Sequence, residues 1–297
     1  MRRLADNTLR RAESFNPDVR LLGVVRTLIA VAELLGILLT PDSKLLTCAG
    51  DRGLTLWCVS GQSSHALGTV RILAIVLLLL VASGIRPQWT CVPHWYLACS
   101  FNADVTLSDG GDSVAAVVTL LLIPMLLGDR RTWHWTHPRK GLTSTWRGSS
   151  YAAWCTLRIQ TTIIYGQAAL SKLMYPEWRN GTAMTSVFVD PSNGLPLGVR
   201  HLVEPALESA ALSKAISWTT IFIELVIAAC ALSVRATRAA ALLAGLLHGG
   251  IALALGLESF SLIMIATVLA VHGGAGREKQ RTIRSFRPTS GELVSSF

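Results

Sequence analysis

The stretch that decides the fold class is Arg158-Ile-Gln-Thr-Thr-Ile-Ile-Tyr-Gly-Gln-Ala-Ala-Leu-Ser-Lys172. It is long and apolar enough to enter a bilayer as a helix, yet it contains an arginine, two glutamines, a tyrosine and a lysine. Charges at membrane depth cost a few kcal/mol each, so they persist mainly where they face protein or a water-filled cavity. Arg158, Tyr165 and Lys172 recur at helical spacing and share one face. This polar stripe predicts either a ligand-lined groove or a helix pair whose polar groups satisfy each other.

The composition of the whole chain favours a membrane protein. Of its 297 residues, 51% are hydrophobic and 15% are charged, and the mean hydropathy is +0.46. These values exclude disorder and argue against a soluble enzyme of this size. No long Gly/Ser/Pro-rich linker interrupts the apolar runs, so we expect one helical bundle.

Apolar runs predict eight membrane-spanning helices and therefore an all-α, polytopic fold. The third run is the weakest, because Pro93, His94 and Asn102 interrupt it and it is shorter than the about 20 residues of a full span. A tilted or re-entrant segment would also account for it. The predicted spans are residues 21–40, 69–85, 88–103, 113–128, 151–174, 214–234, 238–256 and 259–273.

The distribution of positive charge predicts that both termini are cytoplasmic. With eight spans, most arginines and lysines fall on one side, including Arg130, Arg131 and the basic tail, and this side is expected to be inside. The net charge of +9 is thus a topology signal, and scattered basic residues argue against nucleic-acid binding. The predicted parts are a cytoplasmic segment (1–20), a transmembrane domain (21–273) and a basic cytoplasmic tail (274–297). The first span lacks a convincing cleavage site, so it should remain as an anchor.

Two cysteines fall in a predicted outward loop, residues 41–68. Cys48 and Cys58 could form a disulfide there, although cysteine count alone leaves the pairing open. The other four cysteines lie in or near spans and are interpreted as small buried hydrophobes. No metal site is predicted.

Other spans add ionisable groups to the stripe. Glu224 and His248 lie near the middle of two different spans, and we expect them to form one polar cluster with Lys172 in a cavity that opens outward. For His248 alone, a hydrogen bond in the core is the plainer alternative. Asp112 opens the fourth span, where it suits a helix N-cap or a place in the site.

Standard catalytic motifs are absent from the sequence, including HExxH, GxSxG, the Walker loop and the dinucleotide fingerprint. His134 and His137 lie close together, but no third metal ligand is in view. Trp133 and Trp135 are typical of aromatic residues at a bilayer edge.

Several of these segments resemble a known family. Arg158-Ile-Gln160, Ile164-Tyr165, Ser171-Lys172 and Glu177-Trp178-Arg-Asn-Gly-Thr-Ala183 are similar to the horizontally transferred transmembrane (HTTM) domain, which is shared with vitamin K-dependent gamma-carboxylase. Support extends to Val25-Arg26, Phe222-Ile-Glu224, and His248 with Phe260-Ser261.

Within that domain, the chain most resembles the sporulation-delaying protein B family. The matching pieces are Ser83-Gly-Ile-Arg-Pro87, His94-Trp95, Asp109-Gly-Gly-Asp112, Asp129-Arg-Arg131, Trp133-His-Trp135 and Trp178-Arg-Asn-Gly-Thr-Ala183. The resemblance implies a multi-pass protein of the bacterial plasma membrane. It also implies action with a small companion protein in maturing a precursor into a secreted peptide toxin.

The carboxylase resemblance implies that Lys172 is a base, because a lysine in the matching segment deprotonates vitamin K hydroquinone. A desolvated lysine suits this role. However, the chain lacks the large lumenal domain of the carboxylase, and it has Asp112 where the carboxylase pattern has an asparagine-histidine pair. A hydroquinone cofactor is therefore implied by resemblance only.

The expected site combines the residue pattern with the resemblance. Three functional classes remain open: an enzyme acting on a peptide, an enzyme using a quinone-like cofactor, and a non-catalytic peptide exporter or immunity-type binder. Lys172, His248 and Glu224 are the predicted catalytic residues, and the predicted substrate-binding residues are Arg158, Tyr165, Asp112 and Trp178.

Overall fold

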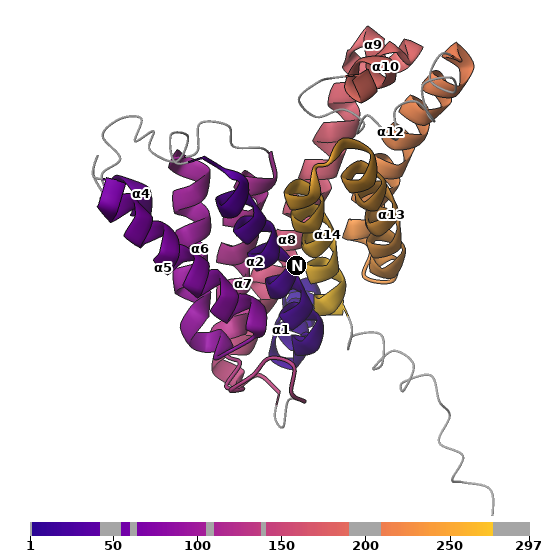
Figure 1. Cartoon of the computed structure of the whole chain (residues 1–297). Coiled ribbons are helices and arrows are strands. Elements are labelled where there is room, and N and C mark those ends of the chain that lie inside the picture. Colours follow the sequence, from indigo (N-terminus) through magenta and orange to yellow (C-terminus); the bar gives the residue numbers. More distant parts are fainter. Residues whose placement is uncertain are drawn as a thin grey trace, which may run out of the picture.

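The computed structural model describes residues 2–41, 55–59, 64–104, 110–137, 141–189 and 209–275. These parts are helical and contain no strand; the one extended pairing among them is an isolated bridge between Ile85 and Trp133. Figure 1 shows the helices side by side in a bundle. They are α1 (Arg2–Ser14), α2 (Val19–Leu39), α4 (Leu56–Val59), α5 (Ser64–Ser83), α6 (Pro87–Asp104), α7 (Gly110–Leu127), α8 (Ser144–Met174), α9 (Pro176–Asn180), α10 (Thr182–Val189), α12 (Ala210–Leu232), α13 (Thr237–Leu255) and α14 (Glu258–Ala275).

Each of the eight predicted spans corresponds to a helix, namely α2, α5, α6, α7, α8, α12, α13 and α14. Within the described residues, six of these are long and apolar enough to cross a membrane, and the more polar α6 and α8 are the two others. The all-α, multi-pass class is confirmed. The third span is one continuous helix of 18 residues that runs through Pro93.

The eight helices pack as two groups. In the first group, α2 packs on α5, α5 on α6, and α6 on α7; in the second, α8 packs on α12, α12 on α13, and α13 on α14. The groups join where α7 meets α8 and where α14 meets α2 (Figure 1). One hydrophobic cluster runs through both groups, and a smaller one is confined to α2, α4, α5 and α6.

Local sequence explains where several helices begin and end. Asp18 caps α2, because its Oδ1 accepts hydrogen bonds from the backbone N–H groups of Arg20 (3.1 Å) and Leu21 (3.3 Å). Gly256 ends α13 in the left-handed region at φ 64°. Such caps satisfy backbone groups that have no partner inside the helix.

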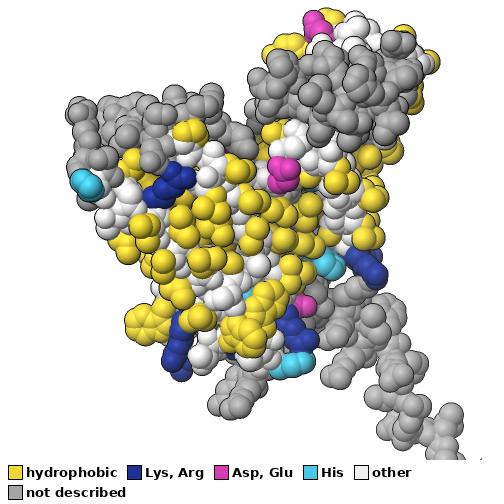
Figure 2. Space-filling model, in the orientation of Figure 1, with side chains coloured by type: hydrophobic (Ala, Val, Ile, Leu, Met, Phe, Trp, Pro, Cys, Tyr) yellow, Lys and Arg dark blue, Asp and Glu magenta, His cyan; other side chains and the backbone are white. Residues whose placement is uncertain are grey.

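The exposed surface matches a bilayer setting. Figure 2 shows hydrophobic side chains over the middle of the visible face and basic side chains near the end where α1 lies. We call this end, which carries Arg20, Arg130 and Arg131, the basic end. Large apolar residues such as Leu246 (73% exposed) and Leu253 (82% exposed) project outward from α13, as expected of helices that face lipid. The cytoplasmic placement of the basic end stays a prediction.

Among the described residues, four helices have no counterpart in the predicted spans. The segment expected as 1–20 contains α1, α4 lies in the predicted outward loop 41–68, and α9 and α10 follow the fifth predicted span. Figure 1 shows α9 and α10 at the far ends of α8 and α12. With 31 residues, α8 is about 46 Å long, whereas the hydrocarbon core is about 30 Å thick. It therefore has room to extend past the bilayer toward α9.

Candidate functional site

Lys172 and Glu224 form an ion pair between α8 and α12. The Lys172 Nζ donates hydrogen bonds to Glu224 Oε1 (2.8 Å) and Oε2 (3.0 Å). The same ammonium lies 5.0 Å from the ring centroid of Trp178 in α9, within the range of a cation–π interaction. The Lys172 side chain is 20% exposed and that of Glu224 is 9% exposed. The predicted base is thus held in place and still partly accessible.

Tyr165 and His248 form a second pair, between α8 and α13. The Tyr165 hydroxyl lies 2.8 Å from His248 Nε2, and the imidazole packs edge-on against Phe260, with ring centroids 5.5 Å apart. Both side chains of the pair are buried. The other ring nitrogen, Nδ1, has no hydrogen-bond partner among the described residues. His248 therefore carries one buried ring nitrogen that no hydrogen bond within the described residues satisfies.

The two pairs lie close together in the second group. Glu224 is near enough to interact electrostatically with Tyr165, and Lys172 with His248. The structure thus brings together the three predicted catalytic residues with Tyr165 and Trp178. His248 hydrogen-bonds to Tyr165, whereas the sequence led us to expect that it would form one polar cluster with Lys172 and Glu224. A single cavity around all of them stays a prediction.

Arg158 lies at a different place along the stripe. Its guanidinium donates hydrogen bonds to the carbonyl oxygens of Ala231 (3.0 Å) and Leu232 at the end of α12. It also lies 4.8 Å from the ring centroid of Trp154. A cation at a helix C-terminus satisfies free carbonyl groups and the helix dipole. These contacts fix α8 against α12, and none of them joins Arg158 to Lys172.

Asp112 also lies apart from the two pairs. It is buried in the first turn of α7, in the first group of helices. A carboxylate there complements the positive end of the helix dipole, but Asp112 is the third residue of α7 and not its N-cap, so the N-cap expectation is wrong. The role of Asp112 in substrate binding remains a prediction.

The predicted disulfide falls only partly within the described residues. Cys58, in α4, is disulfide-bonded. Cys48 lies outside the described residues, so the pairing of these two cysteines stays a prediction. The four cysteines expected to be buried are free thiols, but only Cys91 is buried, whereas Cys99, Cys155 and Cys230 are partly exposed.

A further buried polar set lies in the first group of helices and was not predicted as a site. His94 Nε2 of α6 lies 3.0 Å from Glu33 Oε2 of α2, and both side chains are 2% exposed. Two turns earlier on α2, Arg26 donates to Thr90 Oγ1 at 2.7 Å. The Arg26 Nε and Nη1 groups have no partner in the described part of the chain. The sequence feature that could have predicted this set is the presence of an acidic residue, Glu33, in the first span and of a histidine, His94, in the third.

The α5–α6 turn and the α7–α8 loop interlock at the basic end. Arg131 binds Asp129 through Nε (2.9 Å to Oδ1) and Nη2 (2.7 Å to Oδ2), and it also donates to the carbonyl oxygens of Val19, His134 and Thr136. The backbone N–H of His134 donates to the Gly84 carbonyl at 2.9 Å. Burial, with help from nearby arginines, lowers the pKa of His134 to about 4. His134 is therefore a neutral residue that fills the junction.

Comparisons with known proteins show two relatives of this chain. The chain is 33% identical to sporulation-delaying protein SdpB of Bacillus subtilis (strain 168), over 86% of this chain and 82% of that protein. It is 30% identical to the protein YitO of the same organism, over 88% of both chains. The chain belongs to the SdpB family. No family model matches it, and no solved structure does either.

Two separate motifs of the SdpB-like pattern meet in the structure. Ser83–Pro87 forms the α5–α6 turn, and Asp129–Trp135 forms the α7–α8 loop that packs on it. The indole N–H groups of Trp133 and Trp135 both donate to the Ser83 carbonyl. A β-carbon on Gly84, which has φ 90°, would overlap the His134 ring. These residues thus hold the basic end of this protein together and lie apart from the Lys172 pair.

Proposed function

We propose that this protein is a plasma-membrane factor that matures a secreted peptide toxin from its precursor, together with a small companion protein. Membership of the SdpB family supports the biological setting. The observation that supports a chemical role is the Lys172–Glu224 pair, because it is hydrogen-bonded, partly exposed and covered on one side by the Trp178 ring. Acid–base pairs at membrane depth mark functional sites more often than structural ones.

In this proposal, Lys172 acts as a base toward the bound precursor. One proton passes from the Nζ ammonium to a Glu224 oxygen across the 2.8 Å hydrogen bond, which leaves a neutral amine and a neutral acid. The amine then takes a proton from the substrate and becomes an ammonium again. Proton transfer by a positioned side chain typically accelerates a reaction by about 10²–10⁴-fold.

Tyr165 and His248 would support the same site as a buried hydrogen-bonded pair. The Tyr165 hydroxyl and His248 Nε2 share one hydrogen bond, and because both side chains are buried, they would hold the surroundings of Lys172 in place and would not meet the substrate directly. Trp178 places an aromatic wall above the lysine. This wall suits an apolar peptide side chain, which gains free energy by leaving water.

A second candidate is a membrane enzyme that uses a hydroquinone. The same Lys172 ammonium, Trp178 ring and Tyr165 hydroxyl favour it, since a quinol ring can stack on the indole and lose a proton to the amine. The HTTM resemblance implies this chemistry. In that case, activity should depend on added quinol, and maturation of a peptide in quinone-free membranes would argue against it.

Deletion of the gene in its own host tests the proposed function against the exporter alternative. If the protein matures the precursor, mass spectrometry of deletion cells should show unprocessed precursor and no mature peptide. If the protein only exports the peptide, the same cells should contain trimmed peptide. Cytoplasmic mature peptide in the deletion strain would overturn the proposal, and restoration by the wild-type gene is the control.

A further inference from the structure

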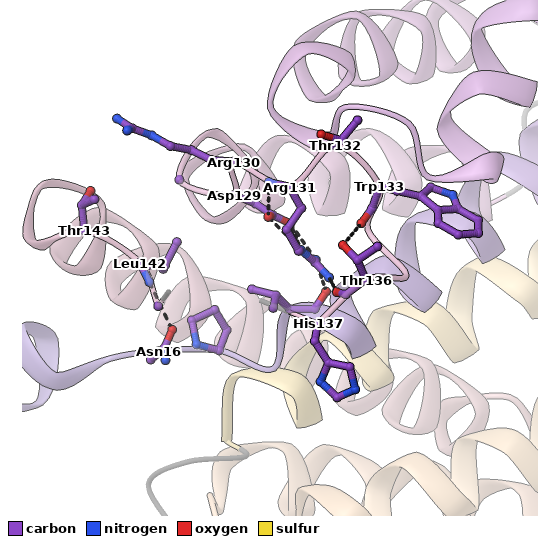
Figure 3. A pocket seen from close by; sticks show the side chains of 14 residues that line it. Asn16, Asp129, Arg130, Arg131, Thr132, Trp133, Thr136, His137, Leu142 and Thr143 are labelled. Atoms are coloured by element: carbon purple, nitrogen blue, oxygen red, sulfur yellow. Dashed lines mark hydrogen bonds and ion pairs between the residues drawn. The ribbon is translucent and has the colours of Figure 1, made fainter. Parts of the chain in front are cut away.

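A pocket at the basic end opens between the α7–α8 loop and the segment that joins α1 to α2. Its volume is about 780 Å³, which is within the range of sites for small organic ligands. Figure 3 shows Arg130, Thr132 and Thr136 along one side, with Asn16, Leu142 and Thr143 facing them. None of the residues proposed to act on the peptide lines this pocket.

The charges around the pocket leave a net positive potential. Asp129, the acidic residue in the lining, is neutralised by its two-pronged pair with Arg131. Arg130 is exposed, and it makes no hydrogen bond or ion pair with any described residue. In Figure 3 its side chain extends away from the Asp129–Arg131 pair. A guanidinium left unpaired in this way is suited to bind the oxygens of an anion.

Neutral donors complete the lining. The hydroxyl of Thr143 makes no capping hydrogen bond to α8, and the Asn16 side chain accepts a hydrogen bond from Leu142 N–H, which leaves its amide N–H₂ free to donate. His137 lines the pocket and contacts the Arg20 guanidinium. Asp18 lies next to Arg20 in sequence, but its carboxylate is occupied by the α2 cap. Among the side chains that line the pocket, free hydrogen-bond donors therefore outnumber free hydrogen-bond acceptors.

The position of the pocket indicates where its ligand comes from. Val19 begins α2 and Gly128 follows α7, so the pocket lies at the level where the spans end. Trp133 also lines it and is 48% exposed, as is typical of side chains at the headgroup layer. Basic pockets between transmembrane helices are known binding sites for anionic lipid headgroups.

We infer that this pocket binds the phosphate-bearing headgroup of an anionic phospholipid, with Arg130 as its main charged contact. The phosphate lies against the Arg130 guanidinium, and the Thr132 and Thr143 hydroxyls and the Asn16 amide donate to the remaining headgroup oxygens. The inference does not depend on the proposed function, because the pocket and the Lys172 pair share no residue.

Native mass spectrometry of the full-length protein in detergent tests this inference. Wild-type protein should retain one phosphatidylglycerol in preference to phosphatidylcholine. Arg130→Gln should weaken phosphatidylglycerol binding by about tenfold, since loss of one charge-assisted hydrogen bond has an effect of this size. The matched control is Arg238→Gln, which removes an exposed arginine from the first turns of α13 and should leave binding unchanged.

A competition arm separates the two sources of phosphate. Soluble glycerol phosphate should displace the lipid only at much higher concentration if the headgroup binds together with its acyl chains. Displacement at equal concentration, still sensitive to Arg130→Gln, would assign the pocket to a soluble phosphate compound. If Arg130→Gln elutes as an aggregate in size-exclusion chromatography, Thr143→Val, which removes a hydroxyl that lines the pocket, replaces it with the same expected direction. Equal lipid binding by the pocket variant and Arg238→Gln overturns the inference.

Discussion

In the first group of helices, Glu33 and His94 are each 2% exposed, whereas in the second group Lys172 is 20% exposed and Glu224 is 9% exposed. Both pairs join an acid to a base across two helices, at similar distances of 3.0 Å and 2.8 Å. The Glu33–His94 pair, which we call the sealed pair, cannot meet a substrate without movement of the bundle. The Lys172–Glu224 pair, which we call the open pair, can meet one, and Trp178 lies beside it. Accessibility rather than chemistry therefore separates a pair that stabilises the fold from one that can act.

The largest expected effect is loss of peptide maturation in Lys172→Ala. Removal of the base should lower the maturation rate by at least about 10²-fold, while the protein remains folded, because water can enter the space that the partly exposed Lys172 side chain leaves beside Glu224. Lys172→Arg should also fail if a proton must move, because arginine does not deprotonate. Peptide mass in culture, divided by the yield of solubilised protein, measures the effect. Lys214→Ala, an exposed lysine of α12, is the control, and normal peptide from Lys172→Ala would remove Lys172 from the mechanism.

A double-mutant cycle tests whether the Tyr165–His248 pair acts together with the Lys172–Glu224 pair. His248→Ala should be nearly as harmful as Lys172→Ala, and the double variant should be little worse than either, since members of one catalytic unit are strongly non-additive. Tyr165→Phe, which removes only the hydroxyl bound to His248, should have an intermediate effect. The same peptide assay reports all four proteins. Effects that multiply would show that the two pairs work independently.

Loss of the sealed Glu33–His94 pair should lower the stability of the fold and leave peptide maturation unchanged. His94→Ala leaves the Glu33 carboxylate buried without its partner, so the free energy of unfolding should fall by about 3–5 kcal/mol. Maturation per folded molecule should stay close to that of the wild type. Thermal unfolding in detergent and the peptide assay measure the two quantities. A stable but inactive His94→Ala would break the comparison, because it would place the sealed pair in the chemistry.

The stability of the protein should depend on close packing between the α5–α6 turn and the α7–α8 loop at the basic end. Gly84→Ala should lower stability by about 3 kcal/mol, because its positive φ is strained for alanine and the new methyl group overlaps His134. Gly68→Ala is the control. Gly68 lies near the start of α5, whereas Gly84 follows its end, and a β-carbon on Gly68 would meet nothing within 4 Å. Comparison of the two unfolding temperatures gives the result. Equal temperatures would mean that the junction tolerates a shift of the histidine.

The smallest expected effect is a pH dependence that arises from His134. Because its pKa is lowered in the fold, from 6.5 to about 4, its contribution is fully present above about pH 6.5 and is lost as the pH falls toward 4. Between pH 7 and pH 5 this loss should be about 2 kcal/mol. His134→Gln should flatten that part of the stability curve. An unchanged slope in His134→Gln would assign the acid sensitivity to another group.

The sequence was a good guide to the spans and to several polar residues that the structure brings together. Runs of apolar residues are a local property, and all eight became helices. Lys172, Glu224, Tyr165 and His248 were identified because a charge at membrane depth is costly wherever it occurs.

Partners between helices were harder to predict. Arg158 shares the helical face of Lys172, yet it binds the end of α12, because the relative height of two helices cannot be read from spacing along one of them. The Glu33–His94 pair was missed for the same reason. The pocket beside Arg130 depends on how two loops and an interhelical segment fold together, and no local pattern signals it.

The contact between α14 and α2 has a consequence for biogenesis. Ser259 at the start of α14 donates a hydrogen bond to the Ala32 carbonyl, 227 residues earlier, and the Gly273 carbonyl accepts one from Asp18 N–H. The first span therefore acquires one of its main neighbours only after seven other spans have left the ribosome. Until then, its buried charged residues must be accommodated by the insertion machinery or by α5 and α6. Completion of the bundle is thus a post-insertion step, and the order of synthesis differs from the order in which the core closes.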